Sequence, residues 1–495
     1  MLMAGLDVGT TGCKITVYQE DGSFLGRVYQ DYPAVNANNV HEVDAADIWT
    51  AVQKIICSAS EKFPEIGGIG ITSFGESFVL VDGNDCPLMP AMLYTDTRGI
   101  KECEKLIRLF GANKISSITG LAPAYMYSLP KLMWVKRNKP EIWNRVKYIF
   151  LIEDFIVYML SGKRQIDYSL AARTMAFDIH HLEWSESLFN AAGINQDFFS
   201  QPVPIGTPAG EIRPELAEQM GLSKKTLIVS ISHDQVAAAI GSGIFEEFLA
   251  VDGAGTTECI TPMFSNCDIL KMAAGSYSVV PYIFPGKFVS YAFNFTGGAA
   301  AKWFIDNLAG YAAAEASRNG KSVYEKLEAN WNHVPTGLLV LPHFSGAATP
   351  YMDPGSRAAI IGLTASSTQQ EIYLAVLEGV CYEMRLNVET LRKAGIDVKA
   401  MRAAGGGAGS RVWLQMKADI LNMPISALKT KEAGAAGSAM LVGVALKIFE
   451  NVQEAARKMV EIRETFLPQP SIQAQYDEIY ERYRKLYDAV RPLMN

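Results

Sequence analysis

The sequence lacks the patterns typical of proteins that bind nucleic acid or zinc. Its 495 residues carry 45 Lys and Arg against 52 Asp and Glu, which gives a net charge of −7. Because no basic surplus is available to neutralise phosphates, we expect no nucleic-acid partner. The seven cysteines are odd in number and include no C-x-x-C pair, so we expect no zinc site and the reduced thiols of a cytoplasmic protein.

A long apolar run free of charge is also missing. The most apolar stretch, YIFLIEDFIVYML, carries Glu153 and Asp154 in its middle and therefore predicts a buried helix rather than a membrane span. The first residues lack the basic-then-apolar order of a signal peptide, because Asp7 interrupts them. We therefore expect neither a membrane span nor a membrane partner.

A P-loop is absent, yet the first residues contain another turn suited to phosphate. In GLDVGTTGCK an apolar run ends at Asp7, glycines and threonines follow, and an alternating strand pattern begins at Cys13. A P-loop would need GxxxxGK[ST] and a following helix. Here a glycine turn would offer backbone N–H groups, with the hydroxyls of Thr10 and Thr11 as further donors. An ordinary tight hairpin is the alternative.

A second copy of this turn favours the phosphate interpretation. Asp252 opens the stretch DGAGTT, again after an apolar run and before a strand-like segment, about half the chain after Asp7. A motif repeated at this distance indicates a duplicated fold with two facing phosphate hairpins. We place the main boundary near residues 243–248 and expect the halves to be packed across a cleft. Asp7, at the end of its strand, could hold a magnesium-bound water.

Strand and helix patterns alternate along the chain, which predicts α/β layers. Residues 44–60 predict a helix, and IGGIGITSF predicts a buried strand. Residues 367–370 have capping-box spacing before a helix that Gly395 should end. The tail carries an aromatic stripe that we expect to dock on its own domain, with a dimer contact as the alternative. The helix after the capping box carries an apolar stripe, made of Ile372, Val376, Val380, Met384, Val388 and Leu391. The aromatic stripe of the tail is made of Tyr476, Tyr480, Tyr483, Tyr487 and Val490.

Three other segments are candidates for chemistry. LIVSISHD predicts a buried strand that runs into Asp234, which either caps the next helix or accepts a proton from an attacking hydroxyl. Glu76 follows another buried strand. Tyr94, Asp96 and Arg98 alternate, so on an extended segment they face one way and would suit a polyhydroxy ligand. A surface salt bridge between Asp96 and Arg98 is the alternative.

The glycines of GGGAGS, residues 405–407, lie between a predicted strand and a predicted helix. Backbone at such a turn commonly lies against a nucleotide, with helix N–H groups facing it. Close packing of the helix on the strand is the alternative interpretation.

Together these motifs resemble the FGGY family of carbohydrate kinases, within the actin- and hexokinase-like ATPase superfamily. The resemblance spans residues 4 to about 447. Seven ordered motifs carry it: GLDVGTTGCK, YTDTR, SHDQVAAAIGSG, DGAGTTEC, NFTGGAAAKWF, EGVCYEMRLNVETL and GGGAGSRVWLQMKADILNMPI.

The resemblance implies an α/β fold of two duplicated RNase H-like domains, as in actin-like ATPases, flanking a catalytic cleft. Residues 1–245 would form the N-terminal domain with the sugar site, and 246–447 the C-terminal domain with the adenosine site. Residues 448–495 would be a helical tail packed on the second domain. The implied reaction transfers the γ-phosphoryl group of ATP to a sugar hydroxyl with Mg²⁺ present, and the halves would close to exclude water.

The resemblance also implies roles for individual residues. Asp234 would be the catalytic base and would contact the substrate, and Asp7 would act on the magnesium shell through water. The sugar would meet Glu76, Tyr94, Asp96 and Arg98. The phosphates and the nucleotide would be held by Thr10, Thr11, Lys14, Gly255, Thr256, Gly298, Lys302, Gly406, Gly407 and Arg411.

The substrate is expected to be a five- or six-carbon ketose. Xylulose-type kinases tend to show Gln-Met-His where this chain has Phe74-Gly75-Glu76, and glycerol-type kinases show Arg-Glu. A small polyol such as glycerol or erythritol is therefore the alternative substrate. A non-catalytic sugar- and ATP-binding module is a further alternative, although such a protein would be expected to have lost Asp7 or Asp234. A homodimer is possible.

Overall fold

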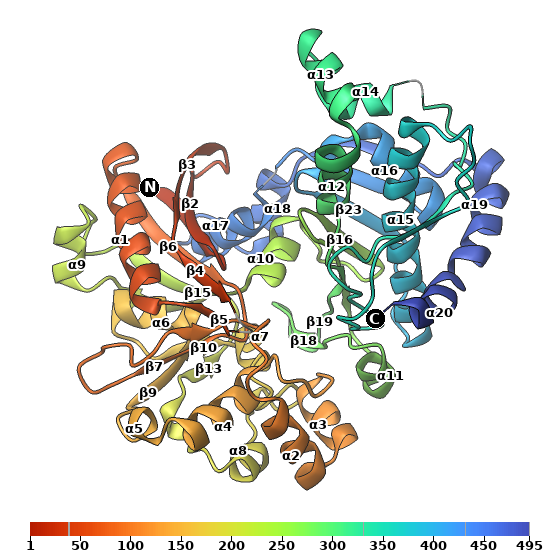
Figure 1. Cartoon of the computed structure of the whole chain (residues 1–495). Coiled ribbons are helices and arrows are strands. Elements are labelled where there is room, and N and C mark those ends of the chain that lie inside the picture. Colours follow the sequence, from red (N-terminus) through yellow and green to blue (C-terminus); the bar gives the residue numbers. More distant parts are fainter. Residues whose placement is uncertain (38–39, 330, 431, 495) are drawn as a thin grey trace. The chain divides into compact units, whose positions relative to one another are not determined.

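The computed structural model describes residues 1–37, 40–329, 331–430 and 432–494, and the chain divides into two compact units (Figure 1). The first unit comprises Met1–Phe245, Ser278–Val289 and Glu432–Val460. The second comprises Glu246–Tyr277, Ser290–Lys431 and Glu461–Asn495. The chain therefore passes between the units several times, whereas the sequence suggested one main boundary near residues 243–248. Among the described residues, no helix has the length and apolar character needed to span a bilayer.

A six-stranded mixed sheet forms the centre of the first unit. Strand β1 (Leu2–Val8) pairs antiparallel with β2 (Gly12–Tyr18) and parallel with β6 (Ile66–Ser73), and β6 pairs parallel with β15 (Leu227–His233). The first predicted hairpin, β1 to β2, is thus confirmed. In order across the sheet the strands are β14 (Thr207–Glu211), β15 (Leu227–His233), β6 (Ile66–Ser73), β1 (Leu2–Val8), β2 (Gly12–Tyr18) and β3 (Phe24–Asp31).

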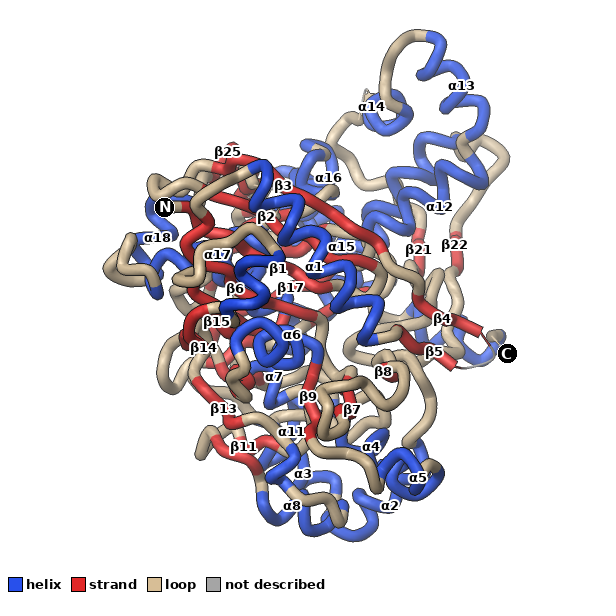
Figure 2. Tube along the Cα trace, turned by 90° about the vertical axis from the view of Figure 1, so that its left-hand side faces the viewer, coloured by secondary structure: helices blue, strands red, loops and turns tan. Residues whose placement is uncertain are grey.

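Helices cover both faces of this sheet. Alternate residues such as Ala4 and Leu6 join the core beneath α1 (Ala45–Lys62) and α6 (Ile152–Ser161). Figure 2 shows α1 lying over β2 and β3. Gly5, which lies between those two residues, faces α17 (Ala433–Ala445) on the other side, against the carbonyl of Ala435.

The second face is packed so closely that only glycine fits at its crossing points. Helix α10 (Asp234–Gly241) crosses α17, and a Cβ on Gly437 would lie 2.1 Å from the carbonyl oxygen of Ala237. A Cβ on Gly241 would lie 1.8 Å from the carbonyl oxygen of Ala433. Because α10 begins at Asp234, this packing fixes the candidate catalytic residue.

The remaining part of the first unit has its own core. Its strands β7 (Phe78–Val81) and β9 (Tyr148–Leu151) pair antiparallel, and α2 (Ile100–Phe110), α3 (Ala112–Thr119) and α4 (Ser128–Asn138) pack around them. The stretch YIFLIEDFIVYML was predicted to be one helix. The structure corrects this prediction: its first four residues are β9, paired with β7, and only the rest is α6.

The second unit has a similar central sheet. Strands β16 and β17 form an antiparallel hairpin, so the second predicted hairpin is confirmed as well. Strand β16 pairs parallel with β23, and β23 with β24. The strands are β16 (Leu249–Ala254), β17 (Glu258–Phe264), β20 (Ala292–Asn294), β23 (Ala400–Ala404), β24 (Ile425–Leu428) and β25 (Ile462–Phe466), and the helices include α12 (Gly298–Leu308), α13 (Gly310–Arg318), α14 (Val323–Glu328), α15 (Gln369–Lys393) and α16 (Arg411–Leu421).

Helix α15 buries the predicted apolar stripe except for its first residue, the half-buried Ile372, but its capping box lies one residue later than expected. The N-cap is Thr368, whose hydroxyl accepts from the backbone N–H of Glu371, and the Glu371 carboxylate accepts from the N–H of Thr368. The predicted pair was Ser367 and Gln370. Glutamate is favoured over glutamine at the third position of the helix because its charged carboxylate makes a stronger hydrogen bond with the N-cap amide.

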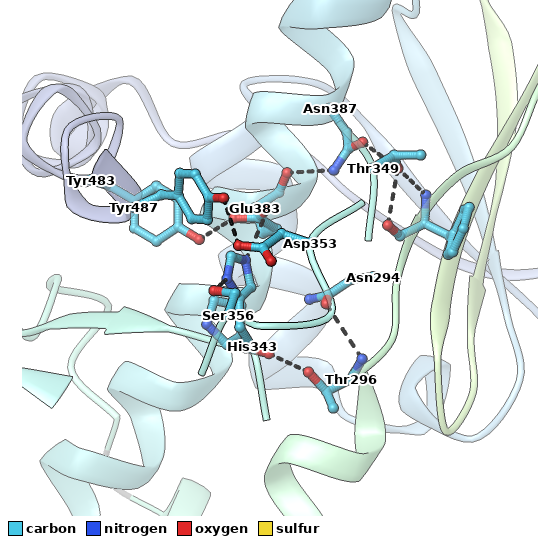
Figure 3. A network of polar contacts seen from close by, with 12 residues as sticks. Asn294, Thr296, His343, Thr349, Asp353, Ser356, Glu383, Asn387, Tyr483 and Tyr487 are labelled. Carbon is cyan, nitrogen blue, oxygen red and sulfur yellow. Dashed lines mark hydrogen bonds and ion pairs between the residues drawn. The ribbon is translucent and has the colours of Figure 1, made fainter. Parts of the chain in front are cut away.

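The C-terminal helices α19 (Pro470–Tyr483) and α20 (Leu486–Val490) are tied to the second unit by buried polar contacts (Figure 3). Tyr483 donates to Glu383 of α15, and Tyr487 donates to Asp353 over 2.8 Å. Glu383 also lies 3.4 Å from the ring of the fully buried His343. The bond of Tyr483 holds the aromatic stripe of the tail against α15, and the bond of Tyr487 holds it against the loop that contains Asp353.

Candidate active site

Three candidate carboxylates lie near the same edge of the first sheet. Asp7 is near the end of β1, Glu76 lies just beyond the end of β6, and Asp234 directly follows β15. These three strands are neighbours and parallel, with Ser73 of β6 opposite both Val8 and His233. The carboxyl ends of adjacent parallel strands meet at one edge, which is where α/β folds bind ligands.

Asp234 carries the strongest sign of a chemical role. Burial, the negative charge of Asp7 and, more weakly, that of Glu76 raise the pKa of Asp234 to about 7. Its side chain is still one third exposed, at 33%. Asp234 is the first residue inside α10, and His233 holds the N-cap position that was the alternative interpretation of Asp234. A carboxylate with this pKa exchanges a proton readily near neutral pH.

Asp7 is paired within the first hairpin and its surroundings. The ammonium of Lys14 lies 3.2 Å from Asp7 and 2.8 Å from Glu432, at the start of the segment that forms α17. Burial alone would lower the pKa of Lys14, but the two carboxylates raise it above its ordinary value. In the turn, Thr10 is half-buried and Thr11 is exposed.

Glu76 is held by a residue that the sequence did not reveal. Arg173 donates from Nε and Nη2 to the same oxygen of Glu76, at 2.6 Å for Nε, and donates from Nη1 to Ser278 over 2.8 Å. Glu76 has a φ of 65°, a conformation rare outside glycine that occurs preferentially at functional sites. A Cβ on Gly75 would lie 2.9 Å from His233, so the glycine is required there.

The segment with Tyr94, Asp96 and Arg98 divides into an exposed part and a buried part. Asp96 is fully buried and accepts from Arg98 Nε at 2.9 Å and from the backbone N–H of His41 at 3.0 Å. Arg98 also pairs with Glu42 at 2.5 Å. Tyr94 is exposed, and after burial the charges of Glu76 and Asp234 contribute most to its raised pKa. Tyr94 therefore shares the environment of the two carboxylates, whereas Asp96 and Arg98 are bonded mainly to each other.

The second unit contains a cavity of about 730 Å³ beside the second hairpin. Of the predicted nucleotide residues, Gly255, Thr256, Gly298, Lys302, Gly406 and Gly407 line it. The N–H of Gly298 donates to the carbonyl of Gly255 over 2.8 Å, which joins the start of α12 to the hairpin. Arg411 is not among the lining residues, because its guanidinium pairs with Glu464.

The cavity also has an aromatic wall that the sequence analysis did not identify. Trp303, Tyr324, Tyr373 and Trp413 line it, and Glu328 contributes a carboxylate that accepts from Ser410 over 2.9 Å. Among the described residues, no group of three or more potential ligands is placed to hold a metal ion. The positions of Trp303 on α12 and Trp413 on α16 could have indicated from the sequence that both line the cavity. Arg173 follows α7 (Tyr168–Ala172), which has only five residues, so no helical periodicity in the sequence points to its role.

Family models match most of the chain. The N-terminal domain of the FGGY family of carbohydrate kinases matches residues 2–241, and its C-terminal domain matches residues 254–446. The chain belongs to the FGGY family of carbohydrate kinases. The expected fold of two α/β domains is thereby confirmed, and so is the expected activity, phosphorylation of a sugar hydroxyl by ATP.

Individual relatives match over nearly their whole length. A xylulose kinase of Staphylococcus epidermidis is 27% identical, covering 99% of this chain and 97% of that protein. A gluconate kinase from Lactobacillus acidophilus has a similar structure with a TM-score of 0.90 and 22% identity, covering 99% of this chain and 98% of the other. A ligand-bound xylulose kinase from Lactobacillus acidophilus gives 0.89 and 23% over the same shares. At these identities the solved structures show the shared fold.

Proposed function

We propose that this FGGY kinase phosphorylates a five- or six-carbon ketose, most closely one of the xylulose type, with Asp234 as the general base. The observation that carries the proposed mechanism is the raised pKa of Asp234, about 7, at the strand edge shared with Asp7 and Glu76. The xylulose kinases that match over almost the whole chain support the choice of a ketose.

In the proposed reaction, the sugar hydroxyl attacks the γ-phosphorus of ATP and the bond to the ADP oxygen breaks. The Asp234 carboxylate takes the hydroxyl proton, and ADP leaves with the electron pair of the broken bond. Positioning and charge stabilisation supply most of the acceleration in such transfers. His233 assists by remaining uncharged, because burial and the charge of Arg173 hold its pKa well below the ordinary value.

We propose that Asp7 faces a magnesium ion through water. A single partly exposed carboxylate, 18% exposed, fits an ion that keeps most of its water and takes few protein ligands. Bound Mg²⁺ would neutralise charge on the phosphates. Lys14, held between Asp7 and Glu432, keeps the Asp7 carboxylate in position and adds positive charge beside Thr10 and Thr11.

The nucleotide is proposed to occupy the cavity of the second unit. Its volume of about 730 Å³ falls in the range of small-molecule sites. Trp303, Tyr324 and Trp413 offer flat surfaces for a base, and the second hairpin offers backbone N–H groups and Thr256 for phosphates. Arg411 would act from the rim, through Glu464, rather than from the wall.

The sugar is proposed to contact Glu76, Tyr94 and Asp234. Both bonds from Arg173 go to one oxygen of Glu76, so the second oxygen is available to a sugar hydroxyl. Asp96 and Arg98 are proposed to act through their mutual pairing, which fixes the segment that presents Tyr94. A small polyol is the second candidate, because Glu76 occupies the place of the glutamate in glycerol-type kinases.

A substrate panel tests this proposal. ADP release would be measured with ketopentoses, ketohexoses, deoxyketoses, glycerol, erythritol and aldonates, at saturating ATP and Mg²⁺. We expect the highest kcat/KM for a ketose, with xylulose first among them. The Asp234→Asn variant gives the background for each compound. A maximum for glycerol or erythritol would replace the ketose assignment by the polyol one.

We also propose that the protein acts in the cytoplasm. All seven cysteines lie among the described residues and are thiols rather than disulfides, as expected for a protein of a reducing compartment.

A further inference from the structure

The two phosphate hairpins carry aspartates at matching positions, but the two carboxylates have different surroundings. The side chain of Asp7 is 18% exposed, whereas that of Asp252 is 2% exposed. Asp7 pairs with Lys14 of its own hairpin. Asp252 pairs with Lys417, which comes from α16, a distant part of the chain. The duplication is therefore asymmetric at its most characteristic residue.

Lys417 joins both ends of the second hairpin. Its ammonium lies 2.6 Å from Asp252 of β16 and 2.8 Å from Glu258 of β17. All three side chains are almost completely buried, at 1–2% exposure. Between these two carboxylates the chain passes through the end of β16 and the turn at residues 255–257, which includes Gly255 and Thr256 of the cavity wall. One cation thus holds the two strand ends from which the turn projects.

The charges of this triad depend on Lys417. Two carboxylates buried side by side would repel each other strongly, and a buried charge without a partner is unfavourable. Burial and the charge of Asp252, opposed by Lys417, set the pKa of Glu258 at about 8, so near neutral pH Glu258 keeps a proton. One ammonium, one carboxylate and one carboxylic acid then give a neutral group.

Helix α16 also connects this anchor to the cavity. Ser410, its N-cap, and Trp413 line the cavity wall, and Lys417 follows one turn later. The ammonium of Lys417 lies 4.7 Å from the centre of the Trp413 ring. A single helix therefore carries part of the nucleotide wall at one end and fixes the phosphate turn further along.

We propose that Lys417 is a positioning residue for nucleotide binding, which acts as a built-in cation on the second hairpin. Because Lys417 is bonded to Asp252, that carboxylate is not available to a metal ion. Of the two hairpin aspartates, only Asp7 then faces the magnesium ion and its bound water. Lys417 itself does not touch ATP: it orients Gly255 and Thr256. The inference rests on the proposed function, in which the hairpin at residues 252–257 holds phosphates.

The test compares Lys417→Met with a triple variant that also carries Asp252→Asn and Glu258→Gln. Lys417→Met leaves the buried charge of Asp252, beside Glu258, without a cation, and we expect the KM for ATP to rise about tenfold or more, with the sugar KM unchanged. The triple variant removes the buried negative charge as well as the cation, so its KM for ATP should lie between that of the parent and that of Lys417→Met. It also covers the case in which the single variant does not fold. Lys429→Met, which breaks only the exposed pair with Glu461, is the control.

Separate arms distinguish failure of this inference from failure of the proposed function. Thr256→Ala tests whether the hairpin binds phosphates at all. If Thr256→Ala raises the KM for ATP while the folded Lys417 variants match the parent, the positioning role of Lys417 is wrong. If none of these variants changes the KM for ATP, the placement of the phosphates is wrong. Equal loss for sugar and ATP in Lys417→Met would indicate only general destabilisation and would also overturn the inference.

Discussion

The consecutive residues His233 and Asp234 bring their side chains together, with Nε2 of the histidine 3.3 Å from Oδ1 of the aspartate. The first residue ends β15 and the second begins α10, so the change from strand to helix allows neighbours to meet. Burial and Arg173 hold the pKa of His233 well below its ordinary value. The histidine therefore brings no positive charge that would weaken Asp234 as a base.

Replacing Asp234 by Asn should abolish most turnover while leaving binding intact. The amide keeps the shape of the side chain but cannot take the hydroxyl proton, and loss of a general base typically costs about 10²–10⁴-fold in rate. Steady-state kinetics would give kcat, and calorimetry would give the affinities for sugar and nucleotide. Near-normal turnover of the variant would limit Asp234 to a structural role at the start of α10.

The rate should rise with pH through the pKa of Asp234. Below about 7 the carboxyl is protonated and cannot act as a base, so kcat/KM should increase up to that pH and then level off. The charge of Asp7 helps to raise this pKa. In Asp7→Asn the midpoint of the residual activity should therefore move to lower pH. An unchanged midpoint in that variant would show that the titration seen in the rate belongs to a group other than Asp234.

Glu76→Gln should impair sugar use and spare ATP. The glutamine keeps the size of the side chain but loses the charge that Arg173 and a sugar hydroxyl both use. Hydrogen bonds to charged groups contribute about 1.5–3 kcal/mol, so kcat/KM for the best sugar should fall accordingly. The loss should differ among the sugars of the panel, because hydroxyl-binding sites reject analogues unevenly. A change confined to the KM for ATP would place the acceptor elsewhere.

Gly437→Ala should destabilise the first unit and reduce turnover together. The added methyl would meet the carbonyl of Ala237 in α10, and overpacking of this kind costs about 1–3 kcal/mol. Because the same helix begins at Asp234, relaxation of the clash should displace the base. Thermal unfolding and kcat would be measured in parallel. The control is Gly310→Ala, whose Cβ would meet nothing within 4 Å and which should leave both values close to the parent.

Glu153→Gln should make stability less dependent on pH. Burial, followed by the charges of Asp167 and Asp154, raises the pKa of Glu153 well above its ordinary value. Above about pH 4.5 the folded state therefore keeps a proton that the unfolded state releases, so the contribution of Glu153 to stability is greatest below that pH and falls as pH rises. The variant should gain on the parent by up to about 1.4 kcal/mol per pH unit in this range. Urea unfolding from pH 5 to 9 measures this, with the exposed Glu61→Gln as control. Parallel curves for parent and variant would contradict the assignment.

The sequence predicted the features that depend on local order. Both hairpins, the strand before Asp234, the helix after Ser410 and the apolar stripe of α15 follow from period and turn chemistry, which act over a few residues. The helix predicted over residues 148–160 failed at its start. The apolar run there is compatible with a helix or a strand, and it forms a strand because it pairs with β7.

The side-chain partnerships were beyond prediction because they join distant segments. Glu76 meets Arg173, and Asp252 meets Lys417, through the topology of each unit rather than through spacing. Asp96 is a different case, because its pairing with Arg98 is local and was the alternative interpretation, although the pair is buried rather than on the surface. Its alternate position with Tyr94 suggested a shared face, but Asp96 lies fully buried on Arg98 while Tyr94 is exposed.

The three-segment construction of the first unit has a consequence for the order in which the protein can be made. Strand β1 leaves the ribosome long before α17, the helix that covers its Gly5 face, because more than half of the described chain lies between them. The nascent chain therefore exposes one side of this sheet until α17 has been synthesised, and the surface that holds α10 and Asp234 in place is completed only then. A message interrupted before residue 432 would yield an open sheet that invites association with other chains and chaperones.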